Sequence, residues 1–128
     1  MKLAILGGGG FRVPLVYEAV ASNALAAEGR AAVRLDEVVL HDSSTERLEA
    51  MRRILDEDAH RFQAPPRVTY TVDLREALTG ADFVFSAIRV GGADGRIKDE
   101  QVALDLGLLG QETIGPGGLV AGFFGVIH

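Results

Sequence analysis

An α/β fold with a doubly wound parallel sheet, in a three-layer α/β/α domain, is predicted by three features of this sequence. Strand-forming residues at 2–6 lead directly into four consecutive glycines and then into a helical pattern. Strand-like and helical runs alternate along the rest of the chain. The run at 81–88 is almost continuously apolar, as in a strand buried on both faces of a parallel sheet. Right-handed crossovers would make the first and fourth strands neighbours, with their carboxyl ends beside a binding crevice.

The composition limits the class of protein. A chain of 128 residues is sufficient for one domain with a substantial core. Its net charge of −5 argues against nucleic-acid and anionic-membrane partners. It contains no cysteine, which excludes disulfides, thiolate zinc sites and a cysteine nucleophile from this chain. Since we find neither a signal peptide nor an apolar run of about 18 residues, we expect a cytoplasmic protein without a membrane partner.

The glycine run at 7–10 predicts a phosphate-binding loop between the first strand and the first helix. Glycine lets backbone N–H groups approach a pyrophosphate closely, and the helix N-terminus adds partial positive charge. Read as G-x-G-x-x-G, the run supplies Gly7 and Gly9, but Arg12 takes the third position. The alternative interpretation is a flexible turn without a ligand. The following helix shows apolar residues at Val13, Val16 and Val20, and we expect it to end by Gly29.

A second strand is predicted at 37–42, ending in Asp42. A dinucleotide-binding fold has a ribose-binding carboxylate at this place, although the spacing from the glycines is longer than usual. Asp42 could instead cap the following helix, and both interpretations stay open at this point. Residues 43–46, Ser-Ser-Thr-Glu, have the spacing of a capping box. We interpret His41 as structural.

The rest of the chain supplies three more elements and a glycine-rich loop. Leu48, Met51 and Leu55 predict a core-facing stripe on the second helix. A short strand at 67–71 and a short helix capped by Asp73 and closed by Gly80 lead to the strand at 81–88. A further helix is predicted at 94–109. The loop at 110–118 is typical of a functional loop, with an exposed connection as the alternative.

These residues resemble glycoside hydrolase family 4, the NAD- and metal-dependent glycosidases, and in particular its 6-phospho-β-glucosidases. The resemblance extends over nearly the whole chain in the right order. The combination of R-V-G-G with G-Q-E-T-x-G-P-G-G is far more specific than the glycine run alone. The matching segments are I-L-G-G-G at 5–9, L-H-D at 40–42, A-D-F at 81–83, I-R-V-G-G at 88–92, D-E at 99–100, G-L-L-G-Q-E-T at 107–113 and G-P-G-G at 115–118.

The resemblance implies an unusual glycosidase reaction on a 6-phosphorylated glucoside or disaccharide. NAD takes hydride from C3 of the sugar, which makes the C2 proton acidic. A base removes that proton while a divalent metal, usually manganese, stabilises the enediolate. Elimination of the aglycone, addition of water and return of the hydride complete the cycle. We also expect a homo-oligomer, since an unpaired sheet edge and an apolar tail favour self-association.

The resemblance also implies roles for individual residues. Arg96 matches a substrate-binding arginine that can grip the sugar phosphate, and Arg89 would support the same corner. Glu112 matches a glutamate near the catalytic base, whose basicity it would raise. The alternative for Arg96 is a solvated helix charge. The implied cofactor-binding residues are Gly7, Gly8, Gly9 and Gly10 at the pyrophosphate, Phe11 in the same loop, and Asp42 at the adenosine ribose.

Two departures from the family pattern qualify these expectations. The hydroxyl residue and Thr-Pro that often follow the family's glycines are replaced by Gly10 and by Phe-Arg-Val-Pro at 11–14. The metal-binding cysteine and histidine, the catalytic tyrosine and aspartate and the substrate-binding asparagine of the family all lie further along than residue 128. We therefore expect residues 1–128 to be an NAD-binding Rossmann-like domain, with no metal ligand of its own, that hydrolyses nothing alone.

Two alternative functions remain open from the sequence. One is a domain of an NAD-dependent dehydrogenase of the lactate and malate type, which shares the fold and the glycine loop but does not explain 110–118. The other is a non-catalytic nucleotide-binding module that dimerises through the apolar run at 119–127. The sequence does not determine the sugar, the anomer, the metal or NAD over NADP, although Asp42 would repel a 2′-phosphate.

Overall fold

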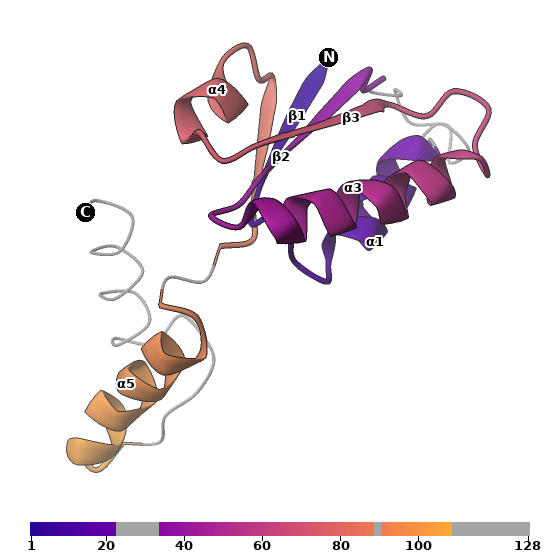
Figure 1. The fold of residues 1–128 in the computed structure, drawn as a ribbon. Helices are drawn as coiled ribbons and strands as arrows, with labels where there is room; N and C mark the ends of the chain where they lie inside the picture. The colour runs from indigo at the N-terminus through magenta and orange to yellow at the C-terminus, as the bar shows by residue number, and fades with distance from the viewer. Residues whose placement is uncertain (23–33, 89–90, 109–128) are drawn as a thin grey trace. The chain divides into compact units, whose positions relative to one another are not determined.

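The computed structural model describes residues 1–22, 34–88 and 91–108 (Figure 1). These residues belong to two compact units, Met1–Ala87 and Ile88–His128. The first unit contains the sheet and the glycine run, and the second contains a single described helix.

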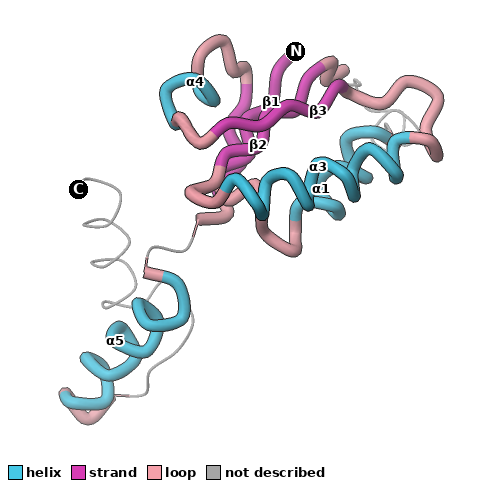
Figure 2. Tube along the Cα trace, in the orientation of Figure 1, coloured by secondary structure: helices cyan, strands magenta, loops and turns pink. Residues whose placement is uncertain are grey.

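The first unit is built on a four-stranded parallel sheet with the strand order β3-β2-β1-β4 (Figures 1 and 2). The first and fourth strands are neighbours, which confirms the predicted doubly wound arrangement. Parallel pairing joins Leu6 to His41 of β2 and to Ser86 of β4, so the carboxyl ends of these three strands meet at one edge. The strands are β1 (Lys2–Leu6), β2 (Glu37–His41), β3 (Arg67–Thr71) and β4 (Phe83–Ser86).

Helices lie on both sides of the sheet. Figure 1 shows α1 and α3 next to each other on one side, with α4 on the other. The core lies under α1 and α3, where apolar residues of the strands meet the predicted stripe of the second helix. The helices are α1 (Val13–Ala21), α3 (Thr45–Ala59) and α4 (Leu74–Leu78), and the fully buried core side chains include Ile5, Val13, Tyr17, Val38, Leu40, Leu48 and Leu55.

The structure confirms the predicted start and end of the short helix α4. Asp73 caps α4, since its Oδ1 accepts the Glu76 N–H at 3.0 Å, and Gly80 follows the helix with a φ of 70°. Helix α1 is described to Ala21, and its predicted continuation toward Gly29 lies outside the described residues.

The prediction that the fourth strand is buried on both faces is wrong. Phe83, Val84 and Phe85 are 43%, 52% and 37% exposed. The reason is the position of β4 at the edge of the sheet, where β1 is its strand partner in the described part of the chain. An apolar run predicts a strand but does not identify what covers it.

The second unit contains α5 (Gly92–Asp105), which confirms the helix predicted from residue 94 onward. The left-handed backbone of Gly91, with a φ of 71°, precedes the helix, and Gly107 has the same φ after it. Glycine adopts this conformation without steric cost. The loop at 110–118 and the apolar run at 119–127 lie outside the described residues. Among the helices in the described ranges, none is long and apolar enough to span a bilayer.

Candidate nucleotide-binding site

The glycine run packs directly on the end of β2. Gly7 has a φ of 85°, and the N–H groups of Gly7 and Gly8 both donate to the carbonyl oxygen of His41, at 2.9 and 2.7 Å. A Cβ added at Gly8 would lie 2.7 Å from the Leu40 Cβ and 2.9 Å from the His41 nitrogen. The loop can therefore sit this close to β2 only because position 8 has no side chain.

The second half of the run contacts the start of α3. The Gly9 N–H donates to Asp42 Oδ2 at 3.1 Å, and the Gly10 N–H donates to the Gly7 carbonyl oxygen at 2.9 Å. A Cβ at Gly9 would lie 2.7 Å from the Arg47 Cβ and 3.0 Å from Asp42 Oδ2. Gly9 thus makes room for Asp42 and Arg47 beside the loop.

All four glycine N–H groups have hydrogen-bond partners inside the protein, and these bonds shape the loop. The predicted contact of Gly7, Gly8, Gly9 and Gly10 with a pyrophosphate stays a prediction. The next two N–H groups, of Phe11 and Arg12, have no hydrogen-bond partner in the described part of the chain. They lie immediately before α1, where the helix dipole favours an anion.

Arg12 occupies the position of the third glycine without disturbing the packing of α1. Its side chain is exposed, and its guanidinium lies 5.4 Å from the centre of the Phe11 ring. A bulky residue is tolerated here because its side chain is exposed, whereas Val13 and Tyr17 make the buried contacts of α1.

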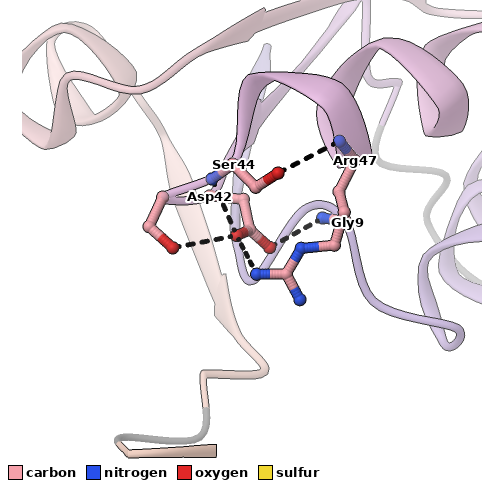
Figure 3. Close-up of polar contacts among 5 residues, drawn as sticks. Gly9, Asp42, Ser44 and Arg47 are labelled. Carbon is pink, nitrogen blue, oxygen red and sulfur yellow. Dashed lines mark hydrogen bonds and ion pairs between the residues drawn. The ribbon is translucent and has the colours of Figure 1, made fainter.

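Asp42 follows β2 directly, and its carboxylate is almost enclosed, with the side chain 10% exposed. Figure 3 shows this carboxylate between the Gly9 N–H and the guanidinium of Arg47. Oδ1 accepts from Arg47 Nη2 at 2.9 Å, from the Ser44 N–H at 3.3 Å and from the Ser43 hydroxyl at 3.4 Å. Each carboxylate oxygen has two lone pairs. The group therefore remains able to accept a ligand hydroxyl at its Oδ2 side.

The structure excludes one of the two interpretations of Asp42, namely that it caps the following helix. The N-cap of α3 is Ser44, whose Oγ accepts the Arg47 N–H at 3.3 Å. Asp42 therefore does not cap the helix. The predicted capping box at 43–46 is also wrong, because the helix begins at Thr45 and the third helical residue is Arg47 and not Glu46.

The remaining predicted site residues belong to the second unit, and two of them lie outside the described residues. Arg96 lies on α5 in the second unit, where its Nε donates to Glu100 Oε1 at 2.7 Å. Arg89 and Glu112 lie outside the described residues. Within the described ranges, no group of three or more His, Cys, Asp and Glu residues could hold a metal ion. The sequence analysis did not identify Arg47 as a site residue. Its position, five residues after Asp42 and in the first turn of the following helix, could have indicated it.

The fold and the site together define a class. A parallel sheet of this order, a glycine loop after β1, a helix that begins behind the loop and a carboxylate after β2 are the features of Rossmann-like dinucleotide-binding domains. Residues 2–127 match the family described as Family 4 glycosyl hydrolase, and the chain belongs to this family. The family resemblance predicted from the sequence is confirmed. The match to a glycosidase family argues against the dehydrogenase alternative.

Individual relatives agree with this placement. A probable 6-phospho-beta-glucosidase of Bacillus subtilis (strain 168) is 31% identical over 129 aligned residues, covering 95% of this chain and 27% of that protein. The structure of the Thermotoga maritima 6-phospho-beta glucosidase with NAD and glucose-6-phosphate matches with a TM-score of 0.78 and 28% identity, over 99% of this chain and 29% of that one. A 6-phospho-alpha-glucosidase from gut microorganisms, in complex with NAD and Mn²⁺, matches with a TM-score of 0.71 and 30% identity, over 94% of this chain and 26% of that one. The chain thus spans less than a third of the length of these relatives.

Proposed function

We propose that this chain is the NAD-binding portion of an enzyme that hydrolyses 6-phosphorylated glucosides. The observation that carries the proposal is the glycine loop held against Asp42 at the carboxyl ends of β1 and β2. Ligands of open parallel α/β sheets bind at this edge. Two similar solved structures that contain NAD support the choice of cofactor, and their names support a phosphorylated glucoside as the substrate.

The residues at this edge fit a dinucleotide. The N–H groups of Phe11 and Arg12 are the donors for the pyrophosphate, at the N-terminus of α1. Asp42 accepts a hydroxyl of the adenosine ribose, and its contact with Gly9 places this carboxylate beside the loop. When bound, NAD supplies the hydride acceptor that the redox-elimination reaction of the family requires. The glycine at position 8 lets the loop pack closely on β2.

The remaining roles belong to the whole enzyme. Arg96 and Arg89 are proposed to hold the sugar phosphate, and Glu112 to tune the base. We propose that manganese or another divalent cation is bound by residues that this chain does not contain, so that the 128-residue chain binds NAD without hydrolysing glucosides. Its similarity to both a 6-phospho-beta- and a 6-phospho-alpha-glucosidase leaves the anomer of the substrate open. A cytoplasmic location is part of the same proposal.

Calorimetric titration of the chain with NAD tests this function, with glucose 6-phosphate as the comparison ligand. We expect saturable binding of NAD that is strongly weakened by Asp42→Ala. Asp56→Ala is the matched control, because this residue is an exposed carboxylate on α3 whose ion pair with Arg52 is separate from the glycine loop. An Asp42→Ala variant that binds NAD as tightly as the Asp56→Ala variant would contradict the proposed site.

A further inference from the structure

The guanidinium of Arg47 stands beside the carboxylate that the proposed function assigns to the adenosine ribose. Arg47 Nη2 lies 2.9 Å from Asp42 Oδ1, and the arginine side chain is 61% exposed while that of Asp42 is 10% exposed. Figure 3 shows the pair at the start of α3, next to Gly9. The positive member of the pair is therefore exposed to solvent, and the negative member is largely buried next to it.

The local backbone fixes this arrangement. The Arg47 N–H is bound by Ser44 Oγ, which anchors the residue in the first turn of α3. An added Cβ at Gly9 would lie 2.7 Å from the Arg47 Cβ, so the base of the arginine side chain packs against the glycine loop. Both charges are thus positioned by the same short segment that positions the loop.

The pair has a chemical consequence for the ligand. A carboxylate alone at the adenosine ribose accepts hydroxyls and repels a 2′-phosphate, whereas an arginine nearby accommodates that phosphate. A guanidinium also binds phosphate in a bidentate way. Here the arginine offsets the charge of the carboxylate and is accessible to a phosphate.

We propose that Arg47 is a specificity-determining residue that lowers the discrimination of Asp42 against a 2′-phosphate, so that the site accepts NADP as well as NAD. This inference rests on the proposed function, because it assumes that the dinucleotide binds at Asp42. It differs from the expectation for Asp42 alone, which is a site restricted to NAD.

The test is the ratio of the dissociation constants for NADP and NAD, measured by titration calorimetry on the full chain. In Arg47→Gln we expect this ratio to rise by roughly fivefold, the size of an exposed ion-pair contribution. The affinity for NAD should fall less than the affinity for NADP. In Asp42→Asn the ratio should fall, because Arg47 is then unopposed. Arg47→Lys should give an intermediate ratio, since it keeps the charge and loses the bidentate geometry.

Arg52→Gln is the matched control, because Arg52 is an arginine of the same helix whose ion pair with Asp56 is separate from the loop. Its ratio should equal that of the unchanged chain, and circular dichroism confirms that each variant is folded. An unchanged ratio in Arg47→Gln with NAD still bound overturns the inference and leaves the proposed function standing. If Arg47→Gln weakens the binding of NAD and of NADP equally, Arg47 only supports Asp42, and the inference is also overturned. If the unchanged chain binds neither dinucleotide, both proposals fail.

Discussion

Replacing Gly8 by alanine tests how the glycine loop is held. The added Cβ would lie 2.7 Å from the Leu40 Cβ and 2.9 Å from the His41 nitrogen, whereas contacting carbon atoms lie about 3.5–4.0 Å apart. Leu40 is fully buried in β2, and the contacted atoms are its Cα and Cβ and the backbone nitrogen of His41, so the sheet cannot yield. The loop must instead move off β2 by about 1 Å.

That movement stretches the two hydrogen bonds to the His41 carbonyl oxygen, now 2.9 and 2.7 Å long, beyond bonding distance. Each such bond contributes about 1 kcal/mol net, and overpacking costs about 1–3 kcal/mol. We therefore expect Gly8→Ala to lower the free energy of unfolding by about 3–5 kcal/mol. The backbone itself does not oppose alanine, because Gly8 is not among the described glycines with positive φ.

The assay is equilibrium unfolding in urea, with Gly80→Ala as the control. A Cβ at Gly80 meets nothing within 4 Å, but its φ of 70° is unfavourable for alanine, and we expect a loss of about 1 kcal/mol there. If Gly8→Ala loses no more stability than Gly80→Ala, the loop is not packed on β2 as described.

Three further predictions follow from the first unit. Tyr17→Phe should keep or raise stability, by up to about 1 kcal/mol, because the Tyr17 hydroxyl is buried without a hydrogen-bond partner among the described residues. A clear loss of stability in urea unfolding would mean that the hydroxyl is hydrogen-bonded. The hydrogen bond and charge of the N-terminal ammonium lower the pKa of Asp36 below 3.8. The contribution of this ion pair to stability is therefore present above the unfolded pKa of Asp36 and is lost as the pH falls through its folded pKa. Asp36→Asn should thus reduce the loss of stability at acid pH. If the acid part of the stability profile is unchanged, the ion pair does not cause that loss. Val84 lies on the exposed strand β4. If the expected homo-oligomer forms through this apolar surface, Val84→Lys should weaken self-association, measured by sedimentation. Unchanged sedimentation would mean that the interface lies elsewhere.

The sequence predicts the elements of the fold well because their signals are local. The glycine run, the aspartate that ends the second strand and the stripe at Leu48, Met51 and Leu55 all depend on short spacings. Right-handed crossovers then place β1 beside β4, as observed.

The parts of the site that could not be predicted depend on contacts between segments. The ion pair of Asp42 with Arg47 requires knowing that α3 begins at Thr45, one residue later than the capping pattern indicates. The N–H groups of Gly7, Gly8 and Gly9 bond to the His41 carbonyl and the Asp42 carboxylate, which lie more than thirty residues away in sequence. The exposure of β4 depends on what covers an edge strand, and an apolar pattern does not contain that information.

The most direct test of the central claim follows the backbone amides of the chain by nuclear magnetic resonance during a titration with NAD. We expect the amide signals of Phe11 and Arg12 to shift most strongly and in a saturable way. The amides of Gly7 and Gly8, which stay bonded to the His41 carbonyl, should shift less. Shifts that leave Phe11 and Arg12 unchanged, or no saturable shift at all, would contradict a dinucleotide site at the carboxyl ends of β1 and β2.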